Sequence, residues 1–308
     1  MNQWEIPEAQ RGDIPEPGRW TVVRPIREGW SSDRKFYLED REGRKRLLRL
    51  SAPETYERKR EEFEALRRFN QFGFPMSQAL EWGMTDTGTA VYTLLTWVEG
   101  RPLLKAMAGM PEAEQYRLGV QAGKILREMH TLRVDPDPAW SRRMKDKMRT
   151  RLEAYERCPA RVEGDRTALA FVKSRMDWID DPQLVQQHGD FHAANLLLTP
   201  EGRIGVIDFN RWDIGDAAEE FYKLQVLDRE RSVPFSRGRL KGYFGGEPPE
   251  TFWRRLAVYT AYACLYSIVW AIPYGEADVE GMQMRCRLAL DDYEGFTQII
   301  PRWYRPSG

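Results

Sequence analysis

Hydrophobic positions recur every second residue in short stretches of the first hundred residues, and every third or fourth residue over much of the remaining chain. The first pattern predicts strands over residues 20–26, 35–38, 46–50, 78–84 and 90–98. Residues 56–69 differ, because Phe63, Leu66 and Phe69 fall on one side of a helix. Later helices are predicted over residues 114–132, 142–156 and 256–272, with short strands between residues 188 and 209. We therefore expect an α+β, bilobal fold with a strand-rich lobe, residues 1–98, and a larger, mainly helical lobe, residues 99–308.

Residues 256–272 are the one segment that calls for a membrane test. They contain no charge in 17 positions, which is the lower limit for a membrane span. Three tyrosines and a moderate share of Leu, Ile and Val favour a buried helix instead. The N-terminus, MNQWEIPEAQRGD, lacks the apolar segment of a signal peptide. We expect a cytoplasmic protein without a membrane partner.

Composition excludes several classes of function. The 308 residues contain 47 Lys and Arg and 47 Asp and Glu, so the net charge is zero. A general nucleic-acid binder needs a basic excess, so we expect no nucleic-acid partner. The three cysteines are far apart in sequence and do not have zinc-site spacing. A monomer or a homodimer is compatible with this composition.

The residues with the clearest chemistry lie between positions 187 and 209. Two apolar runs, Leu196–Leu198 and Ile204–Ile207, flank a Thr-Pro-Glu-Gly-Arg turn and predict a β-hairpin. With a two-residue loop, Asn195 and Asp208 lie directly opposite with Cβ atoms about 5 Å apart, and a bulged turn shifts this register by one residue. Amide and carboxylate oxygens are ligands that suit Mg²⁺. Asp190, five residues before Asn195, adds a carboxylate that can orient an attacking hydroxyl, so the pattern indicates phosphoryl transfer.

The charge of this region has two interpretations. Nine acidic and two basic residues give residues 180–220 a net charge of −7 in a neutral protein. Clustered carboxylates repel one another, so a bound cation is a natural counterbalance. The alternative is an acidic hairpin on the surface, with no catalytic role.

The motif His188-Gly-Asp190 followed by Asn195, Val206-Ile-Asp208-Phe209 and Asp213-Ile-Gly-Asp216 resembles the aminoglycoside phosphotransferase and choline kinase superfamily, including an uncharacterised bacterial branch of it. The resemblance implies a protein-kinase-like fold and a kinase that uses ATP, or GTP, with Mg²⁺. It implies Asp190 as the catalytic carboxylate and Asn195 and Asp208 as Mg²⁺ ligands. It further implies that His188 braces the catalytic loop and that Asp216 ties this loop to the next helix.

The same resemblance extends to the strand-rich lobe and implies a set of nucleotide-binding residues. Residues 28–32 resemble the family's phosphate-binding loop, and Arg49 stands where the family carries a lysine, with Lys45 as a possible substitute. Glu62 is the expected ion-pair partner of Arg49 on the helix over residues 56–69. Residues 94–100 resemble the hinge that reads adenine through backbone groups. The implied nucleotide contacts are Gly29, Ser31, Ser32, Arg49, Glu62, Thr96 and Val98.

The acceptor is expected to be a small molecule with a hydroxyl group. The resemblance implies an aminoglycoside-like antibiotic, an amino alcohol or a sugar, with the antibiotic first, and His192, Asp213 and Trp270 as candidate contacts. The basic run over residues 142–151 is interpreted as a solvated helix face, with contact to phosphates or to an acidic acceptor as the alternative.

Two other functions remain open. Arg49 in place of lysine and a phosphate-binding loop with one glycine are compatible with a catalytically weak, kinase-like binding module. A protein kinase is disfavoured, because no Ala-Pro-Glu-type segment follows Asp208.

Overall fold

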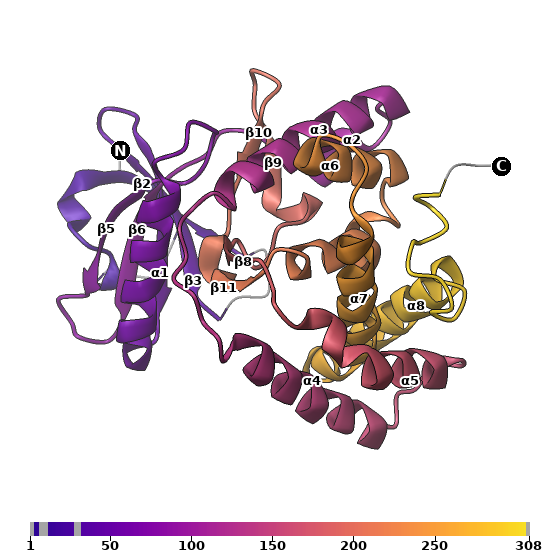
Figure 1. The fold of residues 1–308 in the computed structure, drawn as a ribbon. Helices are drawn as coiled ribbons and strands as arrows, with labels where there is room; N and C mark the ends of the chain where they lie inside the picture. Colours follow the sequence, from indigo (N-terminus) through magenta and orange to yellow (C-terminus); the bar gives the residue numbers. More distant parts are fainter. Residues whose placement is uncertain (1–2, 6–11, 28–31, 306–308) are drawn as a thin grey trace. The chain divides into compact units, whose positions relative to one another are not determined.

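The computed structural model describes residues 3–5, 12–27 and 32–305, and the chain divides into two compact units (Figure 1). The first unit comprises residues 1–101 and 197–210, and the second comprises residues 102–196 and 211–308. The first unit is therefore assembled from two separate stretches of chain. The predicted division after residue 98 does not include this return of the chain, because it depends on contacts distant in sequence.

The first unit contains a six-stranded sheet in the order β1-β2-β3-β4-β6-β5. β1 pairs with β2 in parallel, and all other neighbours are antiparallel. The bounds are β1 (Gln3–Trp4), β2 (Trp20–Ile26), β3 (Arg34–Asp40), β4 (Lys45–Ser51), β5 (Ala79–Met84) and β6 (Val91–Thr96). The five strands predicted in this region are all present, with ends shifted by at most two residues.

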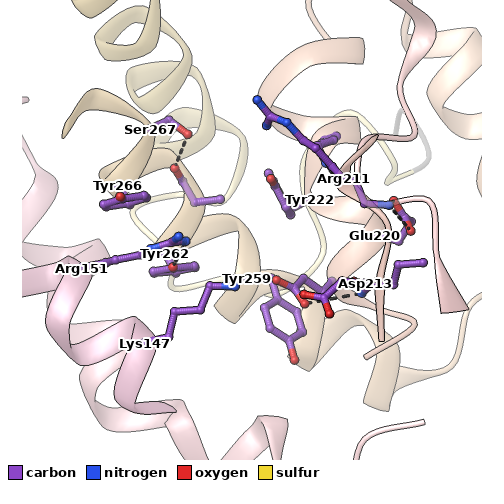
Figure 2. Close-up of a pocket in the computed structure, with 15 residues that line it drawn as sticks. Lys147, Arg151, Arg211, Asp213, Glu220, Tyr222, Tyr259, Tyr262, Tyr266 and Ser267 are labelled. Carbon is purple, nitrogen blue, oxygen red and sulfur yellow. Dashed lines mark hydrogen bonds between the residues drawn. The ribbon is translucent and has the colours of Figure 1, made fainter. Parts of the chain in front are cut away.

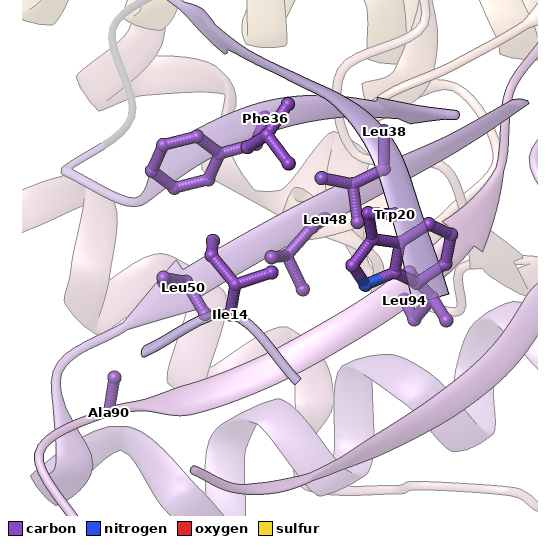
Figure 3. Packing of buried hydrophobic residues seen from close by; sticks show 9 residues of the cluster. Ile14, Trp20, Phe36, Leu38, Leu48, Leu50, Ala90 and Leu94 are labelled. Carbon is purple, nitrogen blue, oxygen red and sulfur yellow. The ribbon is translucent and has the colours of Figure 1, made fainter. Parts of the chain in front are cut away.

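One face of this sheet is covered by an apolar core (Figure 3). Burial alternates along β3, where Phe36 and Leu38 are buried and the residue between them is only partly covered. They pack with Trp20 of β2 and Leu48 of β4. The indole Nε1 of Trp20 donates to the Pro15 carbonyl oxygen at 2.8 Å, which satisfies its polar atom inside the core.

Helix α1 (Tyr56–Phe69) has the predicted bounds and buries the predicted face. The second stretch of the first unit supplies the hairpin of β9 (Leu196–Leu198) and β10 (Ile204–Val206), whose sheet order is β10-β9-β7 with β7 (Arg101–Pro102). Val206 N donates to Pro75 O at 2.9 Å, and the rings of Phe69 and Phe209 lie 5.3 Å apart. The hairpin is therefore packed into this unit.

The second unit is mainly helical. Its α-helices are α2 (Leu103–Met107), α3 (Glu112–Met129), α4 (Trp140–Arg157), α5 (Asp165–Arg175), α6 (Val233–Phe244), α7 (Glu250–Ala271) and α8 (Glu276–Asp292). Two short strands, β8 (Leu184–Gln187) and β11 (Asp213–Asp216), pair antiparallel. In the described part of the chain the short helical segments include η2 (Pro17–Arg19), η3 (Pro53–Thr55), η4 (Met176–Ile179), η5 (Ala193–Asn195), η6 (Phe209–Arg211), η7 (Glu219–Phe221), the π-helix η8 (Leu224–Asp228) and η9 (Ile272–Tyr274).

Helices α3 and α6 lie side by side and approach each other through glycines (Figure 1). Gly119 and Gly123 lie one turn apart on α3, and Gly238 and Gly242 have the same spacing on α6. A Cβ at Gly123 would overlap the Arg239 carbonyl oxygen, and a Cβ at Gly242 would overlap the Val120 carbonyl oxygen. The two backbones are in contact because these positions have no side chain.

Helix α7 contains the apolar segment that raised the membrane question. It is long and apolar enough to cross a membrane by length and composition, but 67% of its apolar window is buried inside the protein. Every residue from Leu256 to Leu265 is buried. This burial agrees with the interpretation of residues 256–272 as a core helix.

Candidate active site

The loop that carries Asp190 turns at a position that only glycine fits. Gly189 follows β8 with φ 76°, and a Cβ there would overlap the Arg211 carbonyl oxygen. The loop therefore lies directly against the segment that enters β11. This packing places Asp190 and Arg211 near each other from positions 21 residues apart in sequence.

Two buried side chains hold this loop by its backbone amides. The Nδ1 atom of His188, which is fully buried, accepts from Asp190 N at 3.1 Å, a geometry compatible with its predicted bracing role. The Glu220 carboxylate accepts from Gly189 N at 3.0 Å and from Phe191 N at 3.4 Å. Burial alone would raise the pKa of Glu220, but His130 and Lys223 outweigh it and lower the pKa to about 2. Glu220 thus stays charged beneath the loop.

Asp190 is surrounded by donors and positive charge. Its carboxylate lies 3.2 Å from Lys223 Nζ, 3.5 Å from His192 Nε2 and 4.0 Å from Arg211 Nε. Burial disfavours the charged form, but the hydrogen bond from His192 and the charges of Lys223 and Arg211 outweigh it and hold the pKa of Asp190 far below its usual range. Asp190 is therefore a fixed carboxylate at any physiological pH.

Asn195 is oriented by the same carboxylate. Its Nδ2 atom donates to the Asp190 backbone oxygen and to Oδ2, both at 2.9 Å, so its amide oxygen is the atom left to ligate a cation. Asp208, in the first unit, has φ 66° and accepts from Arg49 Nη1 at 2.9 Å through Oδ1. A carboxylate and an amide oxygen fit Mg²⁺, which takes few protein ligands beside substrate phosphates. In the described part of the chain no group of three or more His, Cys, Asp or Glu could hold a metal.

The β9–β10 hairpin does not pair Asn195 directly with Asp208, as a two-residue loop would. Gly202 has φ 72° and donates to Thr199 O at 3.0 Å, and Thr199 N donates to Arg203 O at 2.9 Å. This is the bulged turn, which shifts the pairing by one residue. Asn195 and Asp208 are therefore not directly opposite in the ladder.

Sequence reasoning missed a buried ion pair behind the loop. Ala193 N donates to Asp228 Oδ1 at 2.9 Å, and Arg239 Nη1 lies 3.0 Å from Asp228 Oδ2. The guanidinium of Arg239 is 4.9 Å from the centroid of Phe191. Both charged residues are almost fully buried. Other charged residues surround both in sequence, since Asp228 precedes Arg229 and Glu230 and Arg239 lies between Arg237 and Lys241, so nothing in the sequence marks them as buried or as a pair.

Asp216 is tied to a helix, although not to the one that follows it directly in sequence. Its Oδ2 accepts from Arg255 Nη1 at 2.7 Å and from the Tyr259 hydroxyl at 2.9 Å, both on α7. Gln187 Nε2 donates to the Asp216 backbone oxygen at 2.9 Å. Asp216 thus connects β8, which leads into the catalytic loop, to α7.

In the first unit, Arg49 lies in a buried charge cluster that differs from the predicted one. Arg49 contacts Asp33 at 2.8 Å, and Lys59 Nζ lies 3.0 Å from Asp33 and 2.8 Å from Glu62. Glu62 therefore pairs with Lys59, contrary to the predicted Arg49–Glu62 pair, although its charge also favours the charged form of Arg49. Sequence reasoning did not identify Lys59. Its position one turn before Phe63, on the apolar side of α1, could have indicated that this lysine is buried.

Asp33 is the common partner in this cluster. Burial alone would raise the pKa of Asp33, but the charges of Arg49 and Lys59 outweigh it and lower the pKa. Its carboxylate oxygen Oδ2 accepts from both Arg49 and Lys59, so it is shared between two buried cations.

Other predicted nucleotide residues lie at the edge of the sheet or outside the described part. Gly29 and Ser31 lie outside the described residues, and Ser32 is exposed. Lys45, the possible substitute for Arg49, is exposed and pairs with Glu99, whereas Arg49 is buried. Thr96 ends β6, with Trp97 N donating to Lys45 O at 3.3 Å, and Val98 follows where the chain leaves the sheet. Their nucleotide-binding roles stay predictions.

A cavity of about 260 Å³ borders the catalytic loop within the second unit (Figure 2). Gly189, Arg211 and Lys223 form part of its lining, so it adjoins the groups that hold Asp190. Lys147 and Arg151 reach into it from α4, and four tyrosines add aromatic surface: Tyr222, Tyr259, Tyr262 and Tyr266. Most of the other lining side chains are charged or polar, so the cavity suits a hydrophilic small molecule.

The three candidate acceptor contacts have different surroundings. Asp213 lines the cavity. Trp270 packs on Tyr274 with ring centroids 4.8 Å apart and lies 6.0 Å from the Arg211 guanidinium, which lines the cavity. His192 contacts Asp190 and is not among the lining residues.

The family model described as the phosphotransferase enzyme family matches residues 22–258. Similar solved structures include aminoglycoside 2'-phosphotransferase-IIIa in its GDP complex, at 17% identity and a TM-score of 0.65, covering 87% of this chain and 92% of that one. APH(2")-IIia with GDP and kanamycin has a TM-score of 0.68 at 17% identity, covering 91% of this chain and 96% of that one. A thermostable mutant of APH(4)-Ia with AMP-PNP and hygromycin B has a TM-score of 0.68 at 16% identity, covering 92% of this chain and 98% of that one. No curated protein matches the sequence. The structural matches confirm the expected α+β, kinase-like fold.

Proposed function

Because this chain belongs to the phosphotransferase enzyme family, with its aminoglycoside phosphotransferase and protein-kinase-like relatives, we propose that it is a kinase that transfers the γ-phosphate of ATP to a hydroxyl group of a small molecule. The observation that carries the proposal is the state of Asp190. It is a carboxylate held in place by Lys223, His192 and Asn195 beside a cavity that admits a small molecule. GTP is the alternative donor.

In this mechanism Asp190 accepts a hydrogen bond from the acceptor hydroxyl and aims its oxygen at the phosphorus atom. Phosphoryl transfer passes through a loose transition state, so positioning and charge stabilisation supply most of the catalysis. The depressed pKa of Asp190 suits orientation of the hydroxyl more than early removal of its proton. Glu220 and His188 keep the loop backbone fixed during transfer.

Asn195 and Asp208 are the proposed Mg²⁺ ligands. When bound, Mg²⁺ would neutralise charge on the donor phosphates. The Asp190 contacts to Asn195 Nδ2 keep the amide oxygen of Asn195 free for this role. Arg49 supplies fixed positive charge for the phosphates, and Lys59 adds a second cation through the shared Asp33.

The test is a coupled assay of Mg²⁺·ATP turnover with a panel of hydroxylated acceptors, comparing the wild type with Asp190→Asn. We expect turnover to fall about 100-fold or more, because a general acid–base or orienting group contributes about 10²–10⁴. ATP binding, measured by calorimetry, should be retained. Asp146→Asn is the matched control, because this carboxylate is on the surface of α4 with its side chain 63% exposed.

Two results would contradict the proposal. Failure of the wild type to bind either ATP or GTP would exclude a kinase. Binding without turnover, unchanged by Asp190→Asn, would favour the kinase-like binding module instead.

A further inference from the structure

The cavity beside Asp190 has one cationic wall. Lys147 and Arg151 lie one turn apart on α4 and reach into the cavity from the side opposite Arg211 and Glu220 (Figure 2). Within residues 3–5, 12–27 and 32–305, no carboxylate forms an ion pair with Lys147 or Arg151. Two charged residues of the basic run over residues 142–151 therefore line the cavity, and the run is not only a solvated helix face.

Arg151 is preorganised by aromatic side chains of α7. Its Nη1 donates to the Tyr262 hydroxyl at 2.9 Å, and its guanidinium lies 4.4 Å from the centroid of Tyr266. Because the Tyr262 oxygen accepts this bond, its own proton is available to donate. A stacked guanidinium and a neighbouring hydroxyl donor form a geometry suited to an anion.

The carboxylates that line the cavity do not offset the charges of Lys147 and Arg151 enough to attract a ligand with several positive charges. Glu220 and Asp190 are already engaged by the loop amides, Lys223 and His192. Glu219 accepts from Gln187 Nε2 at 3.5 Å, and burial raises its pKa in spite of the nearby charge of Lys147. Asp213 is the remaining carboxylate of the lining, and it is exposed. Three cations, Lys147, Arg151 and Arg211, line the same cavity.

An aminoglycoside carries several ammonium groups, and in this cavity some of them would face Lys147 and Arg151. Like charges at close range cost binding energy and select against such ligands. The cavity volume of about 260 Å³ is also slightly below the range of about 300–1,000 Å³ for ligand sites, which suits a single sugar ring or a short chain.

We propose that the acceptor is a hydroxylated molecule with a carboxylate or phosphate group, whose anion binds Lys147 and Arg151 while its hydroxyl faces Asp190. This inference rests on the proposed function and specifies its substrate class. The tyrosines would contact the apolar face of a sugar ring or chain, and Tyr262 would donate to the anion.

The first experiment compares acceptors that share one ring and differ in charge. Mg²⁺·ATP turnover and thermal stability are measured with glucose, glucuronate, glucose 6-phosphate, glucosamine and kanamycin. We expect an anionic sugar to exceed glucose at least about 10-fold in kcat/KM, and the two anionic arms distinguish carboxylate from phosphate. Preference for glucosamine or kanamycin, or equal rates with glucose and both anionic sugars, overturns the inference.

The second experiment uses Arg151→Gln. We expect KM for the preferred anionic acceptor to rise about 10-fold, with kcat and the KM for ATP nearly unchanged. Arg149→Gln is the matched control, because Arg149 is on the same helix, 56% exposed and paired with Asp146. The exposed Lys147→Gln provides a second variant if Arg151→Gln does not fold, and it should also raise KM.

The two proposals fail in different ways. If Arg151→Gln and Lys147→Gln leave KM unchanged while ATP turnover still depends on Asp190, the acceptor inference is wrong and the kinase proposal stands. If the wild type shows no Asp190-dependent turnover with any compound, the kinase proposal itself is wrong.

Discussion

At the residue scale, Asp33 determines whether the cation cluster of the first unit is stable. Its carboxylate oxygen Oδ2 serves both Arg49 and Lys59, and all three side chains are less than 10% exposed. Removing one partner of a buried ion cluster leaves uncompensated charge, which costs more than the pairing itself contributes. Arg49 enters this cluster from β4, and the second cation, Lys59, enters from α1.

We predict that Asp33→Asn lowers the free energy of unfolding by about 3–5 kcal/mol at pH 7, because Arg49 and Lys59 lose their shared counter-charge. The pKa of Asp33 is lowered from 3.8 in the folded protein. The contribution of Asp33 to the free energy of unfolding is therefore fully present above pH about 4. It is lost as the pH falls through the pKa of Asp33 in the folded protein.

Urea unfolding between pH 7 and pH 3 measures both effects. The difference between wild type and Asp33→Asn should shrink toward low pH. A difference that stays constant across this range, or that the exposed Asp146→Asn reproduces, would contradict the electrostatic explanation.

At the element scale, the contact between α3 and α6 determines where Arg239 is held. Gly123 faces the Arg239 backbone oxygen, and Arg239 pairs with Asp228, which accepts from Ala193 N in the catalytic loop. A displacement of α6 would therefore reach the loop through two hydrogen-bonded residues. The same contact requires glycine on both helices, which helical periodicity alone does not reveal.

We predict that Gly123→Ala destabilises the protein by about 1–3 kcal/mol or more, because the new methyl group meets backbone atoms that cannot rotate away. Gly281→Ala on α8 is the matched control, since the nearest atom to its Cβ is the end of Arg285 at 3.8 Å. That control should be neutral or stabilising by about 0.5–1 kcal/mol. Thermal melts of both variants test the prediction, and equal melting temperatures would show that the helices can separate at no cost.

At the scale of the whole molecule, the first unit is discontinuous in sequence. Its sheet and α1 come from residues 1–101, but Ile204, Val206 and Phe209 return from residues 197–210 and are buried. Burying each large apolar side chain contributes about 1.5–3 kcal/mol. That sum is comparable to the total stability of a domain, about 5–15 kcal/mol.

We predict that a fragment of residues 1–101 does not fold stably, because Phe69 loses Phe209 and Arg49 loses Asp208. Joining residues 196–210 to this fragment through a flexible linker should restore cooperative unfolding. Circular dichroism and hydrogen exchange distinguish the two fragments. A sharp melting transition in the fragment of residues 1–101 alone would contradict the prediction.

Much of the fold was predictable because its signals are local. The period of apolar residues identified α1 with correct bounds and the five predicted strands of the main sheet within two residues. The turn at Gly202 follows from residue types whose conformational preferences act within a few positions. The motif around Asp190, Asn195 and Asp208 also lies within 19 consecutive residues, and that is why it was recognisable.

The sequence by itself determined these elements and the chemistry that the motif can support. Only the tertiary structure decided which charges meet: Lys59 with Asp33 and Glu62, Asp228 with Arg239, and Lys147 and Arg151 with the cavity. The reason is physical. Periodicity reports which side of an element is buried, but the partner of a buried charge is set by chain segments that return from tens or hundreds of residues away.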